Sequence, residues 1–209
     1  MIRKPNNWEQ VEAVEYGERE MLELGGHVVV IRNAAEYTGQ TGNSSLKVCV
    51  DIAPGDKQAG FFQKQFDDNP NSDKKWSNGA TKYVSLKEEH AGMLKAFTTA
   101  VEKSNPGYTW NWDETSLKGK KLVGVFGLEE YEKQDGTIGT ATRLVQFRSI
   151  DKLNEVKIPK VRLLNGSTMD HEEYKNSRSN QSQTTEYTGD SIDGFLNSLP
   201  INADDAFPF

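Results

Sequence analysis

Aromatic and basic side chains alternate along several segments of this chain, and this combination suits single-stranded nucleic acid. A base gains roughly 1 to 3 kcal/mol by stacking on an aromatic ring, while lysine and arginine neutralise the phosphates. Ten residues are candidates for DNA binding: Phe62, Lys64, Lys74, Lys75, Trp76, Lys82, Tyr83, Arg143, Phe147 and Arg148. Strand aromatics such as Phe147 more often belong to a core, whereas Trp76 stands in a polar stretch without apolar neighbours.

No catalytic constellation accompanies these residues. The chain has three widely separated histidines, His27, His90 and His171. Its single cysteine, Cys49, lies within an alternating strand pattern, so we expect neither a nucleophilic triad nor a zinc site. The acid pairs at 67–68 and 129–130 are expected to be solvated surface. We therefore expect no enzymatic activity, no cofactor and no metal, and a metal-dependent nuclease is only a remote third possibility.

Charge is distributed unevenly along the 209 residues, whose formal net charge is -6. Residues 165–209 hold eight acidic and two basic residues and thus carry the whole excess. Residues 1–24 contain six glutamates, which leaves residues 25–164 mildly basic. The overall pI near 5.2 argues against a polyanionic partner, but the balance of this central body does not.

Hydrophobic patterning predicts mainly strands. A branched run from Gly25, an alternating run over 45–52 and a run over 60–66 containing Phe62, Lys64 and Phe66 suggest a three-stranded antiparallel meander. Residues 67–84 are expected to form a long basic loop. Residues 1–24 fit either an arm or a short helix.

The second half of the body predicts one helix and a hairpin. Ser85 and Glu88 have the spacing of a capping box, and apolar residues recur at helical spacing over 86–103. Two strand patterns then flank the turn signal Asp135-Gly136. Pro159 interrupts the last apolar stretch, which is expected to form an edge strand or an extended exit segment.

Three strands, a helix and a hairpin follow the element order of the OB-fold, a five-stranded Greek-key barrel. The expected class is therefore all-β with one helix, with an OB domain over 25–164; another half-open barrel or an α+β sandwich fits the same order. Residues 165–198 are polar and poor in aliphatic side chains, so we expect a disordered linker. Residues 199–209 form an acidic tip.

The last six residues, Asp204-Asp205-Ala206-Phe207-Pro208-Phe209, resemble the acidic tip of bacterial single-stranded DNA-binding proteins, which ends Asp-Asp-Asp-Ile-Pro-Phe. Ala206 and Phe207 are the departures. The order of parts, a body, a polar linker and a tip, is also similar. Because the body is longer than the usual bacterial domain, the chain looks more like a bacteriophage protein of this kind.

This resemblance implies a sequence-nonspecific protein that coats single-stranded DNA during phage replication and recombination. It also implies that Asp204, Asp205, Phe207, Pro208 and Phe209 bind partner proteins of replication, recombination and repair, with the Phe209 ring in an apolar pocket. The alternative is a phage adaptor whose OB-like body binds protein and whose tip mimics that of the host. We expect a cytoplasmic protein with no membrane partner, and a homo-oligomer is compatible with the sequence.

Overall fold

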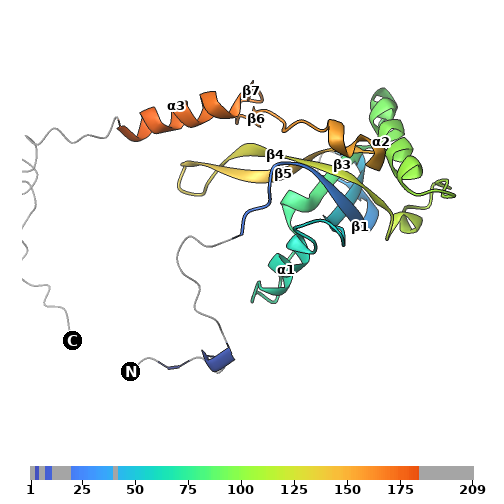
Figure 1. Cartoon of the computed structure of the whole chain (residues 1–209), viewed down its shortest axis with the longest axis horizontal. Coiled ribbons are helices and arrows are strands. Elements are labelled where there is room, and N and C mark those ends of the chain that lie inside the picture. Colours follow the sequence, from blue (N-terminus) through green and yellow to red (C-terminus); the bar gives the residue numbers. More distant parts are fainter. Residues whose placement is uncertain (1–2, 5–7, 11–19, 40–41, 184–209) are drawn as a thin grey trace, which may run out of the picture. The chain divides into compact units, whose positions relative to one another are not determined.

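A computed structural model describes residues 3–4, 8–10, 20–39 and 42–183. The chain divides into two units, Met1–Met169 and Asp170–Phe209, each of which is described by itself. The first unit is mostly β-sheet with few helices (Figure 1).

Seven strands form one sheet in the first unit: β1 (Gly25–Thr38), β2 (Ser44–Ile52), β3 (Thr81–Ser85), β4 (Lys121–Glu132), β5 (Ile138–Arg148), β6 (Val161–Arg162) and β7 (Thr168–Met169). Their order is β3-β2-β1-β4-β6-β7, and β5 also pairs with β4. All pairs are antiparallel except β4 with β6. The sheet is open, since no ladder within the described residues joins β3 to β5.

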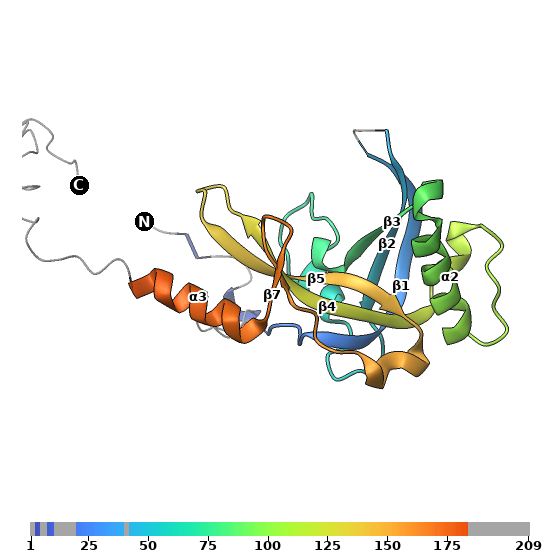
Figure 2. The ribbon, with the colours of Figure 1, turned by 90° about the horizontal axis from the view of Figure 1, so that it is seen from above.

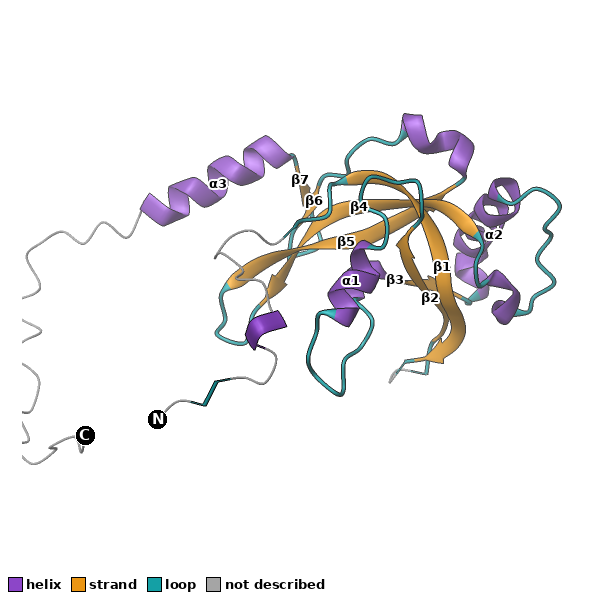
Figure 3. Cartoon of the chain, turned by 60° about the horizontal axis from the view of Figure 1, so that its bottom comes forward, coloured by secondary structure: helices purple, strands orange, loops and turns teal. Residues whose placement is uncertain are grey.

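Helices lie beside this sheet (Figure 3). The first unit contains α1 (Phe61–Asp67), α2 (Ala91–Ser104) and the short 3-10 turns η1 (Trp8–Gln10), η2 (Asn78–Ala80), η3 (Glu88–His90), η4 (Glu114–Leu117) and η5 (Ile150–Glu155). In both Figure 1 and Figure 2 the turn of the β4–β5 hairpin projects away from α2.

The core lies between the strands and these helices. Its fully buried members include Val29 and Ile31 of β1, Val48 of β2 and Phe126 of β4. Phe97 of α2 closes it on one side. Removal of this apolar surface from water, at about 25 cal/mol per Å², is the main stabilising term.

The predicted strands over 27–37 and 45–52 and the hairpin around Asp135-Gly136 are confirmed as β1, β2 and β4–β5. Gly136 adopts a φ of 77°, a left-handed conformation that glycine adopts without steric cost. Asp135 stabilises the same turn because its Oδ1 accepts a hydrogen bond from the Thr137 amide at 2.9 Å.

The predicted strand over 60–66 is wrong, since these residues form α1. Gly60 precedes the helix and has no side chain to cap it. The cap comes from β2 instead: Oδ1 of the buried Asp51 accepts a hydrogen bond from the Phe62 amide at 3.0 Å and one from the Ile52 amide at 2.9 Å. A carboxylate ten residues upstream thus satisfies the first turn of α1.

The predicted loop over 67–84 and the predicted helix over 86–103 need smaller corrections. The third strand of the meander is β3, so the loop ends at Ala80. The α-helix begins only at Ala91, because Ser85 accepts from the Lys87 amide and its hydroxyl contacts His90 Nδ1 at 2.9 Å, which shapes the 3-10 turn η3. The structure therefore has several helices instead of one.

The prediction of disorder over 165–198 is wrong for residues 168–183. These residues contain β7, which pairs with β6 in the first unit, and α3 (His171–Gln183) in the second. Within α3, Lys175 pairs with Glu172 and the Arg178 guanidinium lies over the Tyr174 ring. Residues 184–209, including the predicted partner-binding tip, lie outside the described residues.

The β3 side of the sheet approaches β5 through the turn η2. A Cβ atom on Gly79 would lie 2.7 Å from the Thr142 carbonyl oxygen of β5. We therefore expect Gly79→Ala to lower the free energy of unfolding by about 1 to 3 kcal/mol in urea denaturation, because the backbone must move apart. Gly92→Ala is the control, since nothing lies within 4 Å of its Cβ position. Equal stability of the two variants would show that η2 and β5 do not pack this closely.

Candidate nucleic-acid interface

Two exposed tyrosines lie together on one face of β1, β2 and β3. Tyr37 of β1 and Tyr83 of β3 are each 44% exposed, and their ring centroids are 5.3 Å apart at an angle of 57°. Between them on β2 lies Lys47, whose register partners are Ala35 and Tyr83. We call Tyr37, Lys47 and Tyr83 the tyrosine face.

The strand pattern explains why these rings reach solvent. Register partners in a sheet project to the same side, and neighbours along a strand project to opposite sides. The positions around the two rings carry the short side chains Ala35, Ser45 and Ser85. On the opposite side of the same strands, Leu46 and Val84 are buried in the core. The two rings of the tyrosine face therefore project beyond the short side chains around them, and the β-sheet holds them in place.

The tyrosine face has the chemistry that single-stranded nucleic acid requires. Each exposed phenol ring offers a flat surface to a base, and the Lys47 ammonium can approach a phosphate. Such contacts do not depend on the identity of the base, since every base has a π-face.

Two predicted DNA-binding residues, Phe62 and Lys64, lie on α1 instead of a strand. Phe62 is only 3% exposed, and its ring packs 5.7 Å from that of Phe126. It belongs to the core and has no surface for a base. Lys64 is exposed on α1, apart from the strands on which it was expected.

The predicted platform Trp76 is held by its neighbours. Its Nε1 donates a hydrogen bond to the Val50 carbonyl oxygen at 3.1 Å, and its ring lies 5.7 Å from that of Phe66. The Lys74 ammonium lies over the Phe66 ring, 4.7 Å from its centre. Lys75 is exposed. The apparent isolation of Trp76 in the sequence is thus removed by folding.

Tyr83 and Lys82 are neighbours on β3 but project to opposite sides. The register partner of Lys82 is the fully buried Val48, so this lysine is half-buried on the inner side. Burial is the main cause that lowers the pKa of Lys82; the charge of Arg162 lowers it further, and that of Glu129 opposes the change.

Lys82→Met is expected to raise the free energy of unfolding at pH 7 by about 0.5 to 2 kcal/mol, the usual range for a stabilising substitution. Burial penalises the ammonium form, so the cost is complete below the folded-state pKa and disappears as pH rises through it towards the unfolded value. Urea denaturation at pH 7 and at pH 10 should therefore show a gain that shrinks at the higher pH. The exposed Lys75→Met is the control; a gain for it as large as that for Lys82→Met would contradict this account.

The three remaining candidates follow one another along β5. Arg143 is half-buried and pairs in register with Gly127. Phe147 packs on Phe97 of α2, with ring centroids 5.2 Å apart, and is half-buried as the core interpretation predicts. Arg148 is exposed at the end of the strand. The structure therefore does not join these residues to the tyrosine face.

Sequence reasoning missed Tyr37, Lys47 and Trp112. Tyr37 and Lys47 have no distinguishing local signal, because only the pairing of β1 with β2 and β3 brings them beside Tyr83. Trp112 is 73% exposed, has a φ of 69° that is uncommon for a non-glycine residue, and lies 4.9 Å from the Trp110 ring. The Trp-x-Trp spacing could have drawn attention to it.

In the part of the chain that the structure describes, the His, Cys, Asp and Glu side chains form no cluster that could hold a metal ion. The buried His27 is bound at both ring nitrogens: Nδ1 contacts the Asp56 carboxylate at 3.2 Å, and Nε2 donates to the Glu23 carbonyl oxygen at 3.0 Å. This network ties the segment before β1 to the turn after β2. Cys49 is buried on β2.

No family model matches the chain, and no curated protein matches it. None of the helices in the described ranges has the length and apolar character needed to cross a membrane.

Proposed function

We propose that this protein binds single-stranded nucleic acid without sequence preference and that the tyrosine face is its main contact with the bases. The observation that carries this proposal is the exposed Tyr37–Tyr83 pair, 5.3 Å between ring centroids, with Lys47 on the strand between them. Paired rings beside a cation on a rigid sheet are the arrangement by which sequence-tolerant single-strand binders hold their ligand.

The fold is proposed to be a divergent OB-fold whose barrel is incompletely closed. Four features support this proposal: the β1–β2–β3 meander, pairing of β1 with both β2 and β4, the position of α2 between β3 and β4, and the β4–β5 hairpin. In this fold, nucleic acid is bound around the second and third strands. The tyrosine face includes both.

The acidic tip is proposed to recruit partner proteins of DNA replication, recombination and repair. Its sequence, with Asp204, Asp205, Pro208 and Phe209, resembles that of the bacterial proteins and supports this role. An aromatic residue can occupy an apolar pocket while the aspartates meet a cationic rim. Removal of residues 204–209 should therefore abolish partner capture and leave the tyrosine face intact.

Fluorescence anisotropy of a labelled oligothymidine tests the proposed function. We expect saturable binding, similar binding of mixed-sequence single strands, and weaker binding of a duplex of the same length. The logarithm of the binding constant should fall with the logarithm of salt concentration, with a slope of about -0.7 for each neutralised phosphate. A matched RNA strand would report discrimination at the 2′-hydroxyl. Absence of binding at low salt would refute the proposal.

The alternative function, a phage adaptor whose body binds protein, is favoured by Trp112. An exposed tryptophan with a strained backbone is typical of an anchor residue in a protein interface. The adaptor would leave oligothymidine unbound while residues 204–209 still captured a partner. The anisotropy titration therefore separates the two functions.

A further inference from the structure

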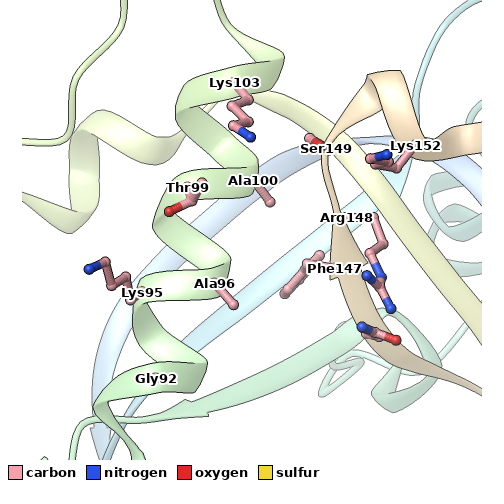
Figure 4. Close-up of a pocket in the computed structure, with 11 residues that line it drawn as sticks. Gly92, Lys95, Ala96, Thr99, Ala100, Lys103, Phe147, Arg148, Ser149 and Lys152 are labelled. Atoms are coloured by element: carbon pink, nitrogen blue, oxygen red, sulfur yellow. The ribbon is translucent and has the colours of Figure 1, made fainter.

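A groove of about 400 Å³ runs between α2 and the end of β5 (Figure 4). Its floor on the helix side is formed by Gly92, Ala96 and Ala100, which recur every four residues and therefore lie along one line of α2. Ala96 and Ala100 point towards Phe147 of β5. Because these helix side chains are small, α2 and β5 leave space between them at this place.

Basic residues from α2, β5 and η5 line the groove. Lys95 and Lys103 belong to α2, Arg148 to β5 and Lys152 to η5. In Figure 4 the Arg148 side chain extends on the side of β5 away from Phe147. Lys95 stands on the outer rim, with its ammonium directed away from β5 in Figure 4. Eight residues separate the two helix lysines, which corresponds to about 12 Å along the axis. The two helix lysines are thus attached further apart than the width of a single phosphate group.

The acidic residues near these cations neutralise only part of their charge. Lys152 pairs with Glu155 at 2.8 Å, and Asp151 interacts electrostatically with Lys103 and Lys152. Among the ion pairs of the described residues, none involves Lys95, Lys103 or Arg148. Positive charge therefore accumulates at this groove.

A neutral neighbour orients Arg148. With its amide oxygen facing the guanidinium, Gln146 accepts hydrogen bonds from Nη2 at 2.8 Å and from Nε at 2.9 Å. Because Gln146 is uncharged, these hydrogen bonds leave the charge of Arg148 unbalanced, and a guanidinium can bind phosphate oxygens through its remaining N–H groups.

We infer that the groove between α2 and β5 binds the phosphate backbone of a nucleic-acid strand, as a site separate from the base contacts of the tyrosine face. The spread of its cations over α2, β5 and η5 and its uncharged floor suit a chain of phosphates better than an isolated anion. This inference rests on the proposed function and extends it to a second contact region.

The test compares two double variants that remove the same charge. Lys103→Gln/Arg148→Gln removes cations from the groove, whereas Lys118→Gln/Lys157→Gln removes two exposed lysines elsewhere. Oligothymidine binding is measured at several salt concentrations for both variants and for the wild type. Removal of two phosphate contacts should make the salt slope of the groove variant shallower by about 1.4, at about 0.7 for each contact. The control should retain the wild-type slope.

The outcomes are distinct. A shallower slope in the groove variant alone supports the groove site. If the wild type binds and both variants keep its salt slope, the groove site is overturned and the proposed function still stands. Failure of the wild type to bind overturns both. Thermal unfolding of each variant identifies any loss of structure. A further variant, Arg148→Lys, keeps the positive charge in this groove. Its salt slope should be close to that of the wild type, because Arg148 is expected to act through phosphate binding.

Discussion

The double variant Tyr37→Ala/Tyr83→Ala is expected to bind oligothymidine about 30-fold more weakly than the wild type, or worse. Stacking contributes roughly 1 to 3 kcal/mol for each base when measured by alanine substitution, so the loss of two platforms costs at least about 2 kcal/mol. Each tyrosine is 44% exposed and neither belongs to the core, so their removal should leave the folded state intact. Fluorescence anisotropy at a fixed salt concentration measures the effect.

Two control variants test whether binding depends on the aromatic rings of the tyrosine face. Tyr37→Phe/Tyr83→Phe retains both rings and should bind nearly as well as the wild type. Tyr131→Ala removes an exposed tyrosine at the far end of β4, with 39% of its surface accessible, and should also bind normally. Equal losses in Tyr131→Ala and in the double alanine variant would show that binding does not depend on the tyrosine face.

Asp51→Ala is expected to lower the free energy of unfolding by about 2 to 6 kcal/mol, since two buried amides lose their acceptor at roughly 1 to 3 kcal/mol each. The carboxylate is 4% exposed and holds the Phe62 amide at the start of α1. Urea denaturation measures the loss, and circular dichroism should report a smaller helical signal.

Asp51→Asn retains one oxygen acceptor and should lose less stability than Asp51→Ala. The exposed Asp73→Ala provides the matched control, because surface substitutions usually change stability by less than about 0.5 kcal/mol. If Asp51→Ala unfolded at the wild-type urea concentration, the attachment of α1 to β2 would not be a source of stability.

Local sequence patterns were sufficient to predict the strands and turns that depend on residues close together in the sequence. The alternation of Leu46, Val48 and Val50 and the turn signal at Asp135-Gly136 both predicted what the structure contains. The error over 60–66 has a different origin. Phe62 and Phe66 repeat every four residues, a spacing that fits both a strand and a helix, and the decisive cap comes from Asp51 on another element.

The candidate site was predictable only in its chemistry. Aromatic and basic residues were expected to lie together on strands and loops, with Tyr83 in the loop over 67–84; it lies on β3 instead. Its partners Tyr37 and Lys47 come from strands whose register is fixed by turns and bulges, including the shift between Ile31 and Asn33. Hydrophobic patterns do not encode this register fully. The same holds for the groove, which needs α2 to lie against β5.

Photo-cross-linking to an oligonucleotide that contains 5-iododeoxyuridine tests most directly whether bases stack on the tyrosine face. Iodouracil couples on irradiation to an aromatic ring in contact with it, and mass spectrometry of the digested protein identifies the residue. The predicted result is cross-linking at Tyr37 and Tyr83, suppressed by an excess of unlabelled oligothymidine. Cross-links at Trp112 with none at either tyrosine would contradict the account.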